Sequence, residues 1–323
     1  MRRMKVVFVT IILLVITIPV SAIDVVCSLP DFMPIVKAIG KDEVNVTSIM
    51  PPGTDPHSFT VTKSTMDNIK NSDLILLANS KLLHFEEKIK ENYKYKCLDF
   101  GDYEKYGASL DSFPKYNKNP HGYWLKLENG IAIAKAVKDA LSSISPQNKD
   151  FFGRNLELFI REVENSKNVT REIVEEEGLE NKSCVAIVPG VCYIIQNMGV
   201  DVGDVLLGEE LGFASGKEIA KVEEKLKSSE YCCIVLPEFM KNSKAGEIAR
   251  QMSEDTGKPV VYVKFIMASK DDSYTALHYK NLIRFADFGG VEEDNQLCYD
   301  VLIFSLVLLI VFPILLLKIR GGI

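Results

Sequence analysis

Two of the four histidines in this 323-residue chain directly follow a proline. His57 ends the run Pro-Pro-Gly-Thr-Asp-Pro-His at 51–57, and His121 lies in Asn-Pro-His-Gly-Tyr-Trp at 119–124. Imidazole nitrogen is a common ligand for Zn²⁺ and similar cations. A single histidine of this kind is better interpreted as a loop-capping residue, but two favour a metal site. The other two, His84 and His278, fall in amphipathic helical patterns and are predicted to be surface or packing residues.

The elements around these histidines are predicted to alternate between strand and helix. The first unit is predicted as strands 25–29, 44–50, 73–78 and 95–100 with helices 31–39, 62–70 and 82–92. The same order returns as strands 184–188, 202–207, 232–236 and 259–263 with helices 191–198, 217–228 and 243–256. Short, almost wholly apolar strands that alternate with helices indicate parallel sheets covered on both faces. The internal repeat therefore predicts two α/β lobes, at 23–144 and 179–296.

A long helix is predicted between the lobes, at 145–178. Ser145 can cap its start, Pro146 suits its first turn, and Gly178 suits its end. A helix of about 31 residues spans roughly 45 Å. We expect a rigid connection that holds the lobes at a fairly fixed angle.

The two histidine loops follow strands of the first lobe. Ligands of open α/β sheets bind beyond the carboxyl ends of the strands, so two facing lobes predict a cleft lined by such loops. Glu209 and Glu210 follow the second strand of lobe two, which corresponds to the position of His57 in lobe one. Carboxylates combined with two imidazoles suit Zn²⁺, Mn²⁺ or Fe²⁺. Solvated loop acids are the plainer alternative for these residues and for the other acidic side chains that follow strands of lobe two, Glu238, Asp271 and Asp272.

Three groups of segments, taken in order, resemble a known family. They are 54–59 with 66–69 and 72–75, then 119–125 with 128–129, and finally 236–239 with 247–249 and 257–260. Together they are similar to the zinc/manganese solute-binding proteins of ABC importers, the metal receptors with a helical backbone, over residues 24 to about 288. The resemblance implies two lobes joined by a long helix, with a divalent metal bound between them as cargo and no organic cofactor. It also implies delivery to an ABC permease and its ATPase.

This sequence departs from that family in lobe two. The third ligand of the family, His or Glu, would fall in Val-Pro-Gly-Val-Cys-Tyr at 188–193, and the acidic fourth ligand would fall near Lys264 and Phe265. Two imidazoles alone would leave the coordination half filled by water. Either lobe two supplies other groups, or the chain is a degenerate relative without tight metal binding. Such a relative would act as a scaffold, a partner subunit or a receptor for another solute.

Other classes of function find little support. The chain lacks His-Glu-x-x-His, Gly-x-Ser-x-Gly, a P-loop and Gly-x-Gly-x-x-Gly, so no enzyme is predicted and no catalytic residue is assigned. The formal net charge of −6 disfavours a nucleic-acid partner, because phosphate binding requires a basic surface. We expect a monomer.

The two ends predict a compartment. Residues 1–22 combine a basic start, a short apolar run and small residues at the exit, which is typical of a secretory signal peptide; an uncleaved anchor is the alternative. Residues 301–317 carry no charge and are followed by Lys318 and Arg320. This pattern predicts a C-terminal membrane anchor at 297–323 with a cytoplasmic tail, rather than a buried core helix. We expect a protein of the cell membrane with an extracytoplasmic ectodomain.

The seven cysteines show no Cys-x-x-Cys spacing and are interpreted as core residues. Cys232 and Cys233 are adjacent in a predicted strand, so their side chains are expected on opposite faces of the sheet. On that basis they would make a poor metal-binding pair.

Overall fold

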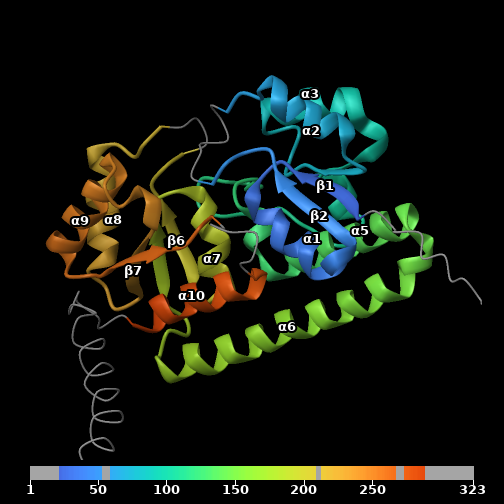
Figure 1. Cartoon of the computed structure of the whole chain (residues 1–323). Helices are drawn as coiled ribbons and strands as arrows, with labels where there is room; N and C mark the ends of the chain where they lie inside the picture. Colours follow the sequence, from blue (N-terminus) through green and yellow to red (C-terminus); the bar gives the residue numbers. More distant parts are fainter. Residues whose placement is uncertain (1–21, 53–58, 209–211, 267–272, 288–323) are drawn as a thin grey trace, which may run out of the picture.

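A computed structural model describes residues 22–52, 59–208, 212–266 and 273–287 of the chain. These residues form two α/β lobes joined by one long helix, which confirms the predicted fold class (Figure 1). The predicted signal peptide, apart from its last residue, and the membrane anchor lie outside the described residues. So do three of the four predicted metal ligands, His57, Glu209 and Glu210.

Lobe one is built on a parallel sheet of four strands in the order β2-β1-β3-β4. Its strands are β1 (Ile23–Cys27), β2 (Val44–Ser48), β3 (Leu74–Leu76) and β4 (Cys97–Leu98). Its helices are α1 (Met33–Gly40), α2 (Lys63–Asn71), α3 (His84–Tyr93), α4 (Phe100–Glu104) and α5 (Leu127–Ile144). Short 3₁₀ turns are η1 (Pro30–Phe32), η2 (Lys41–Glu43), η3 (Lys94–Lys96) and η4 (Tyr123–Leu125). Strand β3 is wholly buried, as expected of a parallel sheet covered on both faces.

Lobe two repeats this arrangement with the parallel order β6-β5-β7-β8. Its strands are β5 (Ser183–Ala186), β6 (Asp201–Val205), β7 (Tyr231–Pro237) and β8 (Val260–Val263). Its helices are α7 (Cys192–Asn197), α8 (Gly216–Leu226), α9 (Lys244–Thr256) and α10 (Tyr274–Ala286), with the turns η6 (Pro189–Val191) and η7 (Glu238–Met240). Each strand thus takes the place of its counterpart in lobe one, which confirms the internal repeat.

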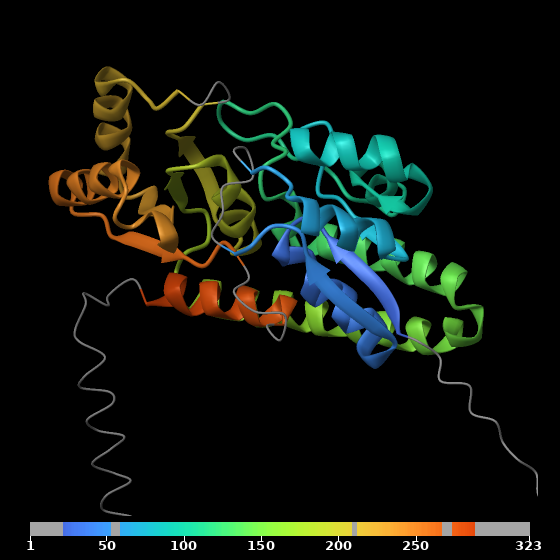
Figure 2. The ribbon, with the colours of Figure 1, turned by 45° about the horizontal axis from the view of Figure 1, so that its top comes forward.

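The connecting segment contains η5 (Pro146–Asn148) and α6 (Lys149–Glu176), a helix of 28 residues that spans about 42 Å. It packs against α1 and α5 of lobe one and α10 of lobe two, so it runs under both lobes (Figures 1 and 2). Gly178, with a φ of 63°, follows its end as predicted. The expected cap at Ser145 is wrong. α6 begins after η5, and among the described residues the buried Ser145 hydroxyl has no hydrogen-bond partner.

Asp99 and Asp102 form a capping box at the start of α4. One further detail differs from the prediction. Cys232 and Cys233 do not face opposite sides of the sheet. The pairing of β5 with β7 shifts between Ser183 and Cys184, so that Cys232 is an extra residue in the strand and its side chain turns to the same side as that of Cys233.

No helix among the described residues is long and apolar enough to span a membrane.

Candidate metal centre

The loop that carries His121 lies at the junction of the two lobes. Asn119 donates a side-chain hydrogen bond to the Pro189 carbonyl of lobe two at 2.8 Å. In return, the Tyr193 hydroxyl of lobe two donates to the Asn119 carbonyl at 2.6 Å. Pro189 begins the turn that follows β5, at the carboxyl edge of its sheet. The structure therefore places His121 at the strand edge where the sequence predicts a ligand.

Asn119 also orients the ring of His121. Its side-chain oxygen accepts from the His121 backbone N–H at 3.0 Å and lies 3.2 Å from Nδ1 of the imidazole. When Nδ1 carries the proton, an acceptor in this place orients the ring as the partners of metal-binding histidines do. The ring of Tyr116 meets the imidazole edge-on, with 5.9 Å between centroids. These contacts fix the orientation of this half-buried ring.

The residue after His121 must be glycine. Gly122 has a φ of 73°, and a Cβ at this position would lie 2.7 Å from the Gly190 carbonyl of lobe two. The left-handed conformation and the close approach of the two backbones both exclude a side chain. The His-Gly pair therefore brings the histidine loop into direct contact with lobe two.

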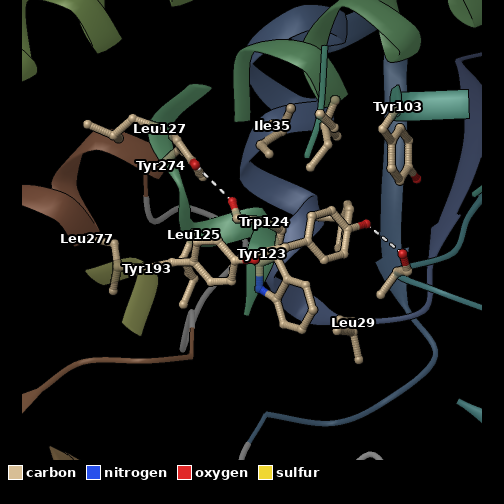
Figure 3. Packing of buried hydrophobic residues seen from close by; sticks show 14 of the residues in the cluster. Leu29, Ile35, Tyr103, Tyr123, Trp124, Leu125, Leu127, Tyr193, Tyr274 and Leu277 are labelled. Atoms are coloured by element: carbon tan, nitrogen blue, oxygen red, sulfur yellow. Dashed lines mark hydrogen bonds between the residues drawn. The ribbon is translucent and has the colours of Figure 1, made fainter. Parts of the chain in front are cut away.

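Aromatic residues of both lobes pack against this loop. The Tyr123 hydroxyl donates to the Ala78 carbonyl at 2.5 Å, and the ring of Trp124 lies 5.9 Å from that of Phe32. Figure 3 shows Tyr123, Trp124 and Leu125 gathered with Tyr193 and Tyr274 of lobe two. The histidine loop thus rests on a rigid apolar cluster that belongs to both lobes.

The loop after β3, which receives Tyr123, is fixed in turn by a buried acid. Both carboxylate oxygens of Glu86 accept backbone hydrogen bonds, from Ala78 at 2.9 Å and from Asn79 at 2.7 Å. Burial raises the pKa of Glu86 to about 7. This group serves the loop geometry and does not itself reach the junction residues described above.

Lobe two offers an aromatic wall where the family resemblance would place ligands. The ring of Phe265 covers Gly190 so closely that a Cβ there would lie 2.4 Å from it. In the turn after β5, the described residues 188–193 contain no histidine or carboxylate. These two positions of the family pattern therefore offer no imidazole or carboxylate in this chain.

The chain on either side of Glu209 and Glu210 lies beside the histidine loop. The Tyr116 hydroxyl, whose ring contacts His121, donates to the Leu207 carbonyl at 3.0 Å. The Gly208 backbone N–H donates to the Gly212 carbonyl at 2.8 Å, and Leu207 forms an antiparallel bridge with Phe213. The two chain segments that flank Glu209 and Glu210 are therefore paired with each other. The other acidic residue on this edge that the structure describes, Glu238, forms an ion pair with Arg284 at 3.0 Å.

The remaining histidines have the surface and packing roles predicted for them. His84 is exposed at the start of α3, next to Glu87 at 3.2 Å. His278 is buried in α10, where its Nε2 lies 2.7 Å from the Thr170 hydroxyl of α6. Sequence reasoning missed Asn119 and Tyr116, which orient His121. The available signal was the asparagine two residues before the histidine, since short polar side chains commonly bond to nearby backbone groups in turns.

Comparison with known proteins decides the family. Residues 25–287 match the family model described as ZnuA, zinc-uptake complex component A, periplasmic. This chain belongs to that family. Its fold agrees with a crystal structure of ZnuA, with a TM-score of 0.68 at 17% identity over 84% of this chain and all of that one.

Two bacterial proteins show the sequence relationship. A metal ABC transporter substrate-binding lipoprotein of Lactococcus lactis is 26% identical over 77% of this chain and 82% of its own length. The manganese ABC transporter substrate-binding lipoprotein PsaA of Streptococcus pneumoniae is 25% identical over 78% of this chain and 84% of its own length. As a member of the ZnuA family, the chain is an extracytoplasmic solute-binding protein of metal ABC importers. These relationships do not favour the alternative of a degenerate scaffold.

Proposed function

We propose that this chain captures a divalent metal ion between its lobes and passes it to an ABC permease and its ATPase. His57 and His121 bind the ion from lobe one, and Glu209, Glu210 or both bind it from lobe two. The observation that carries the proposal is the position of His121 at the lobe junction, where Asn119 contacts both its ring and the Pro189 carbonyl of lobe two.

The chemistry of the junction supports this choice of lobe-two ligands. Residues 188–193 and Phe265 provide no imidazole or carboxylate, and Glu238 is paired with Arg284. The chain flanking Glu209 and Glu210 is anchored to Tyr116, the neighbour of His121. A site with two imidazoles and one or two carboxylates suits Zn²⁺, Mn²⁺ or Fe²⁺, and the named metals of the relatives, zinc and manganese, fall in this set.

The cellular arrangement that we propose follows the two ends of the chain. Residues 1–22 direct export, residues 23–144 and 179–296 form the binding lobes on either side of 145–178, and residues 297–323 anchor the protein in the cell membrane as a monomer. The curated relatives are named lipoproteins, a lipid-borne attachment that would serve the same purpose. The proposed role is binding and delivery, without catalysis.

Metal binding is tested with the full chain in detergent, stripped of metal and titrated with Zn²⁺ or Mn²⁺. At 100 times the dissociation constant, a bound ion should raise the free energy of unfolding by about 2.7 kcal/mol. His121→Ala should abolish most of this gain because it removes an oriented ligand. His84→Ala is the matched control, since His84 is exposed on α3 and should leave the gain intact.

The orienting role of Asn119 is tested in the same assay. Asn119→Ala should weaken metal binding by about 10- to 100-fold, the usual effect of removing a partner that orients a ligand. Asn155→Ala is its control, because that buried amide donates to the Ile39 carbonyl at 2.8 Å, far from the junction. Equal metal affinity in wild type, His121→Ala and Asn119→Ala would refute the proposed site.

A further inference from the structure

Three sulfur atoms meet in lobe two, away from the junction of the lobes. Cys184 of β5 has its Sγ 3.0 Å from that of Cys233 and 3.4 Å from that of Cys232, both in β7. All three sulfurs lie within 4.8 Å of one another. A metal-binding group needs three or more histidine, cysteine or acidic side chains whose ligand atoms come this close. In the described part of the chain, these three cysteines form such a group.

The meeting of the sulfurs depends on the β-bulge. Tyr231 pairs with Ser183 and Cys233 pairs with Cys184, which leaves Cys232 as the extra residue. In a regular strand the side chain of Cys232 would point to the opposite face of the sheet from that of Cys233. Bulges commonly redirect a side chain in this way, and they recur near functional sites.

A neighbouring aromatic residue fits this irregular strand. The ring of Tyr231 lies over Gly203 of β6, where a Cβ would come within 2.4 Å of its hydroxyl oxygen. That hydroxyl donates to Asp204 at 3.0 Å. Contacts with β6 on the same sheet therefore hold the residue that precedes the bulge in place.

The surroundings combine burial with access. Cys184 and Cys233 are fully buried in the core, while Cys232 is only partly buried. Cys232 is therefore the member of the group from whose side a cation can enter.

We propose that Cys184, Cys232 and Cys233 form a second metal site in this chain, which binds a soft cation such as Cu⁺, Cd²⁺ or Zn²⁺ through three thiolates. Thiolates select such cations over the harder Mn²⁺ and Mg²⁺. Binding forms three metal–sulfur bonds. Each thiol that still carries a proton releases it to solvent, and no oxidation state changes. A water molecule completes the coordination of a divalent ion.

The sulfur spacing is close to what this coordination requires. Metal–sulfur bonds of about 2.3 Å place neighbouring sulfurs roughly 3.8–4.0 Å apart in tetrahedral or trigonal geometry. The observed separations of 3.0 and 3.4 Å therefore need to widen by less than about 1 Å, which rotation about the side-chain bonds can supply.

The site is distinct from the proposed inter-lobe site. Cys184 is the second residue of β5, whereas the junction with lobe one begins at Pro189, beyond the other end of that strand. Five residues of extended chain separate the two by about 16 Å. The two sites also differ in chemistry, because the inter-lobe ligands are nitrogen and oxygen atoms.

The test is a titration of the full chain in detergent, reduced and stripped of metal, with Cd²⁺. Cadmium bound to thiolate gives an ultraviolet charge-transfer absorption that imidazole and carboxylate ligands do not give. We expect one equivalent of this absorption in the wild type and in His121→Ala. We expect at least a tenfold loss of affinity in Cys232→Ser, which alters the partly exposed member of the group.

The matched control is Cys97→Ser, which alters a partly buried cysteine of β4 in lobe one and should keep the absorption. Cys184→Ser, checked for folding by circular dichroism, should remove it. Absence of the absorption in the wild type, or its persistence unchanged in Cys232→Ser, would overturn the proposal. So would a disulfide at Cys184 that blocks Cd²⁺ in the chain as isolated, detected as a mass loss of two hydrogens.

Discussion

At the scale of single residues, chemistry here is decided by what touches a side chain. His121 and His278 are both histidines with an oxygen atom beside one ring nitrogen. Asn119 holds His121 at the junction of the lobes, while His278 is enclosed between α10 and α6 beside Thr170. The first is the proposed ligand, and the second is a packing residue whose burial disfavours the charged form.

The buried His278 makes stability depend on pH. Burial lowers its pKa from 6.5 to about 4. Below pH 6.5 the unfolded chain therefore binds a proton that the folded chain does not, and the contribution of neutral His278 is lost as the pH falls towards 4. The free energy of unfolding, measured in urea, should therefore fall more in the wild type than in His278→Gln as the pH is lowered from 7.5 to 4. We expect the difference between the two proteins to change by up to about 3 kcal/mol.

The quantity to compare is the difference in the free energy of unfolding between wild type and His278→Gln at each pH. Glu86, with its pKa raised to about 7, acts in the opposite direction, because the folded chain takes up its proton first as the pH falls. This contribution is common to both proteins and cancels in the difference. A difference that stays constant from pH 7.5 to 4 would show that His278 does not titrate in this way.

At the scale of elements, two turns fit together only because they lack side chains. Gly122, before η4, approaches Gly190 of η6, and Phe265, which follows β8, covers Gly190. Glycine at these positions lets backbone from both lobes meet. The aromatic wall of the proposed metal site is thus a product of the turns and not of any one strand.

Substitution of two glycines by alanine should have opposite effects. Gly190→Ala places a Cβ 2.4 Å from the Phe265 ring and should lower the free energy of unfolding by about 1–3 kcal/mol through overpacking. Gly153→Ala, within α6 and with no atom near the added Cβ, should raise it by up to about 1 kcal/mol through helix propensity. Denaturant midpoints of the two variants give both values, and a stabilising Gly190→Ala would contradict the close packing.

At the scale of the whole molecule, the lobes are coupled at several points along α6 and the junction. Tyr274, at the start of α10, donates its hydroxyl to the Trp124 carbonyl at 2.8 Å and lies 3.0 Å from that of Lys126, as the dashed line in Figure 3 shows for Trp124. Asn197 of lobe two bonds with the Leu125 carbonyl at 2.7 Å. These contacts join backbone of lobe one to side chains of lobe two.

Removing one such contact should weaken the coupling. Tyr274→Phe leaves a buried carbonyl without its donor and should cost about 1–3 kcal/mol. In calorimetry we expect its unfolding transition to broaden or divide, because the lobes then unfold less cooperatively. Tyr231→Phe, which loses a hydrogen bond to Asp204 within lobe two, should be destabilised but keep one transition. If both variants behave alike, Tyr274 does not couple the lobes.

The sequence by itself determined the two lobes, their parallel sheets, the connecting helix and the loop position of His121. These follow from apolar periodicity and from residues that start and end helices, which are local properties. It also named His57, Glu209 and Glu210, which stay predictions. Only the tertiary structure decided which groups surround His121 and the cysteines of lobe two. Asn119 meets Pro189 across 70 residues, and Cys184 meets Cys233 across 49. Such contacts depend on strand register and lobe packing, and a one-residue bulge was enough to reverse the expected direction of Cys232.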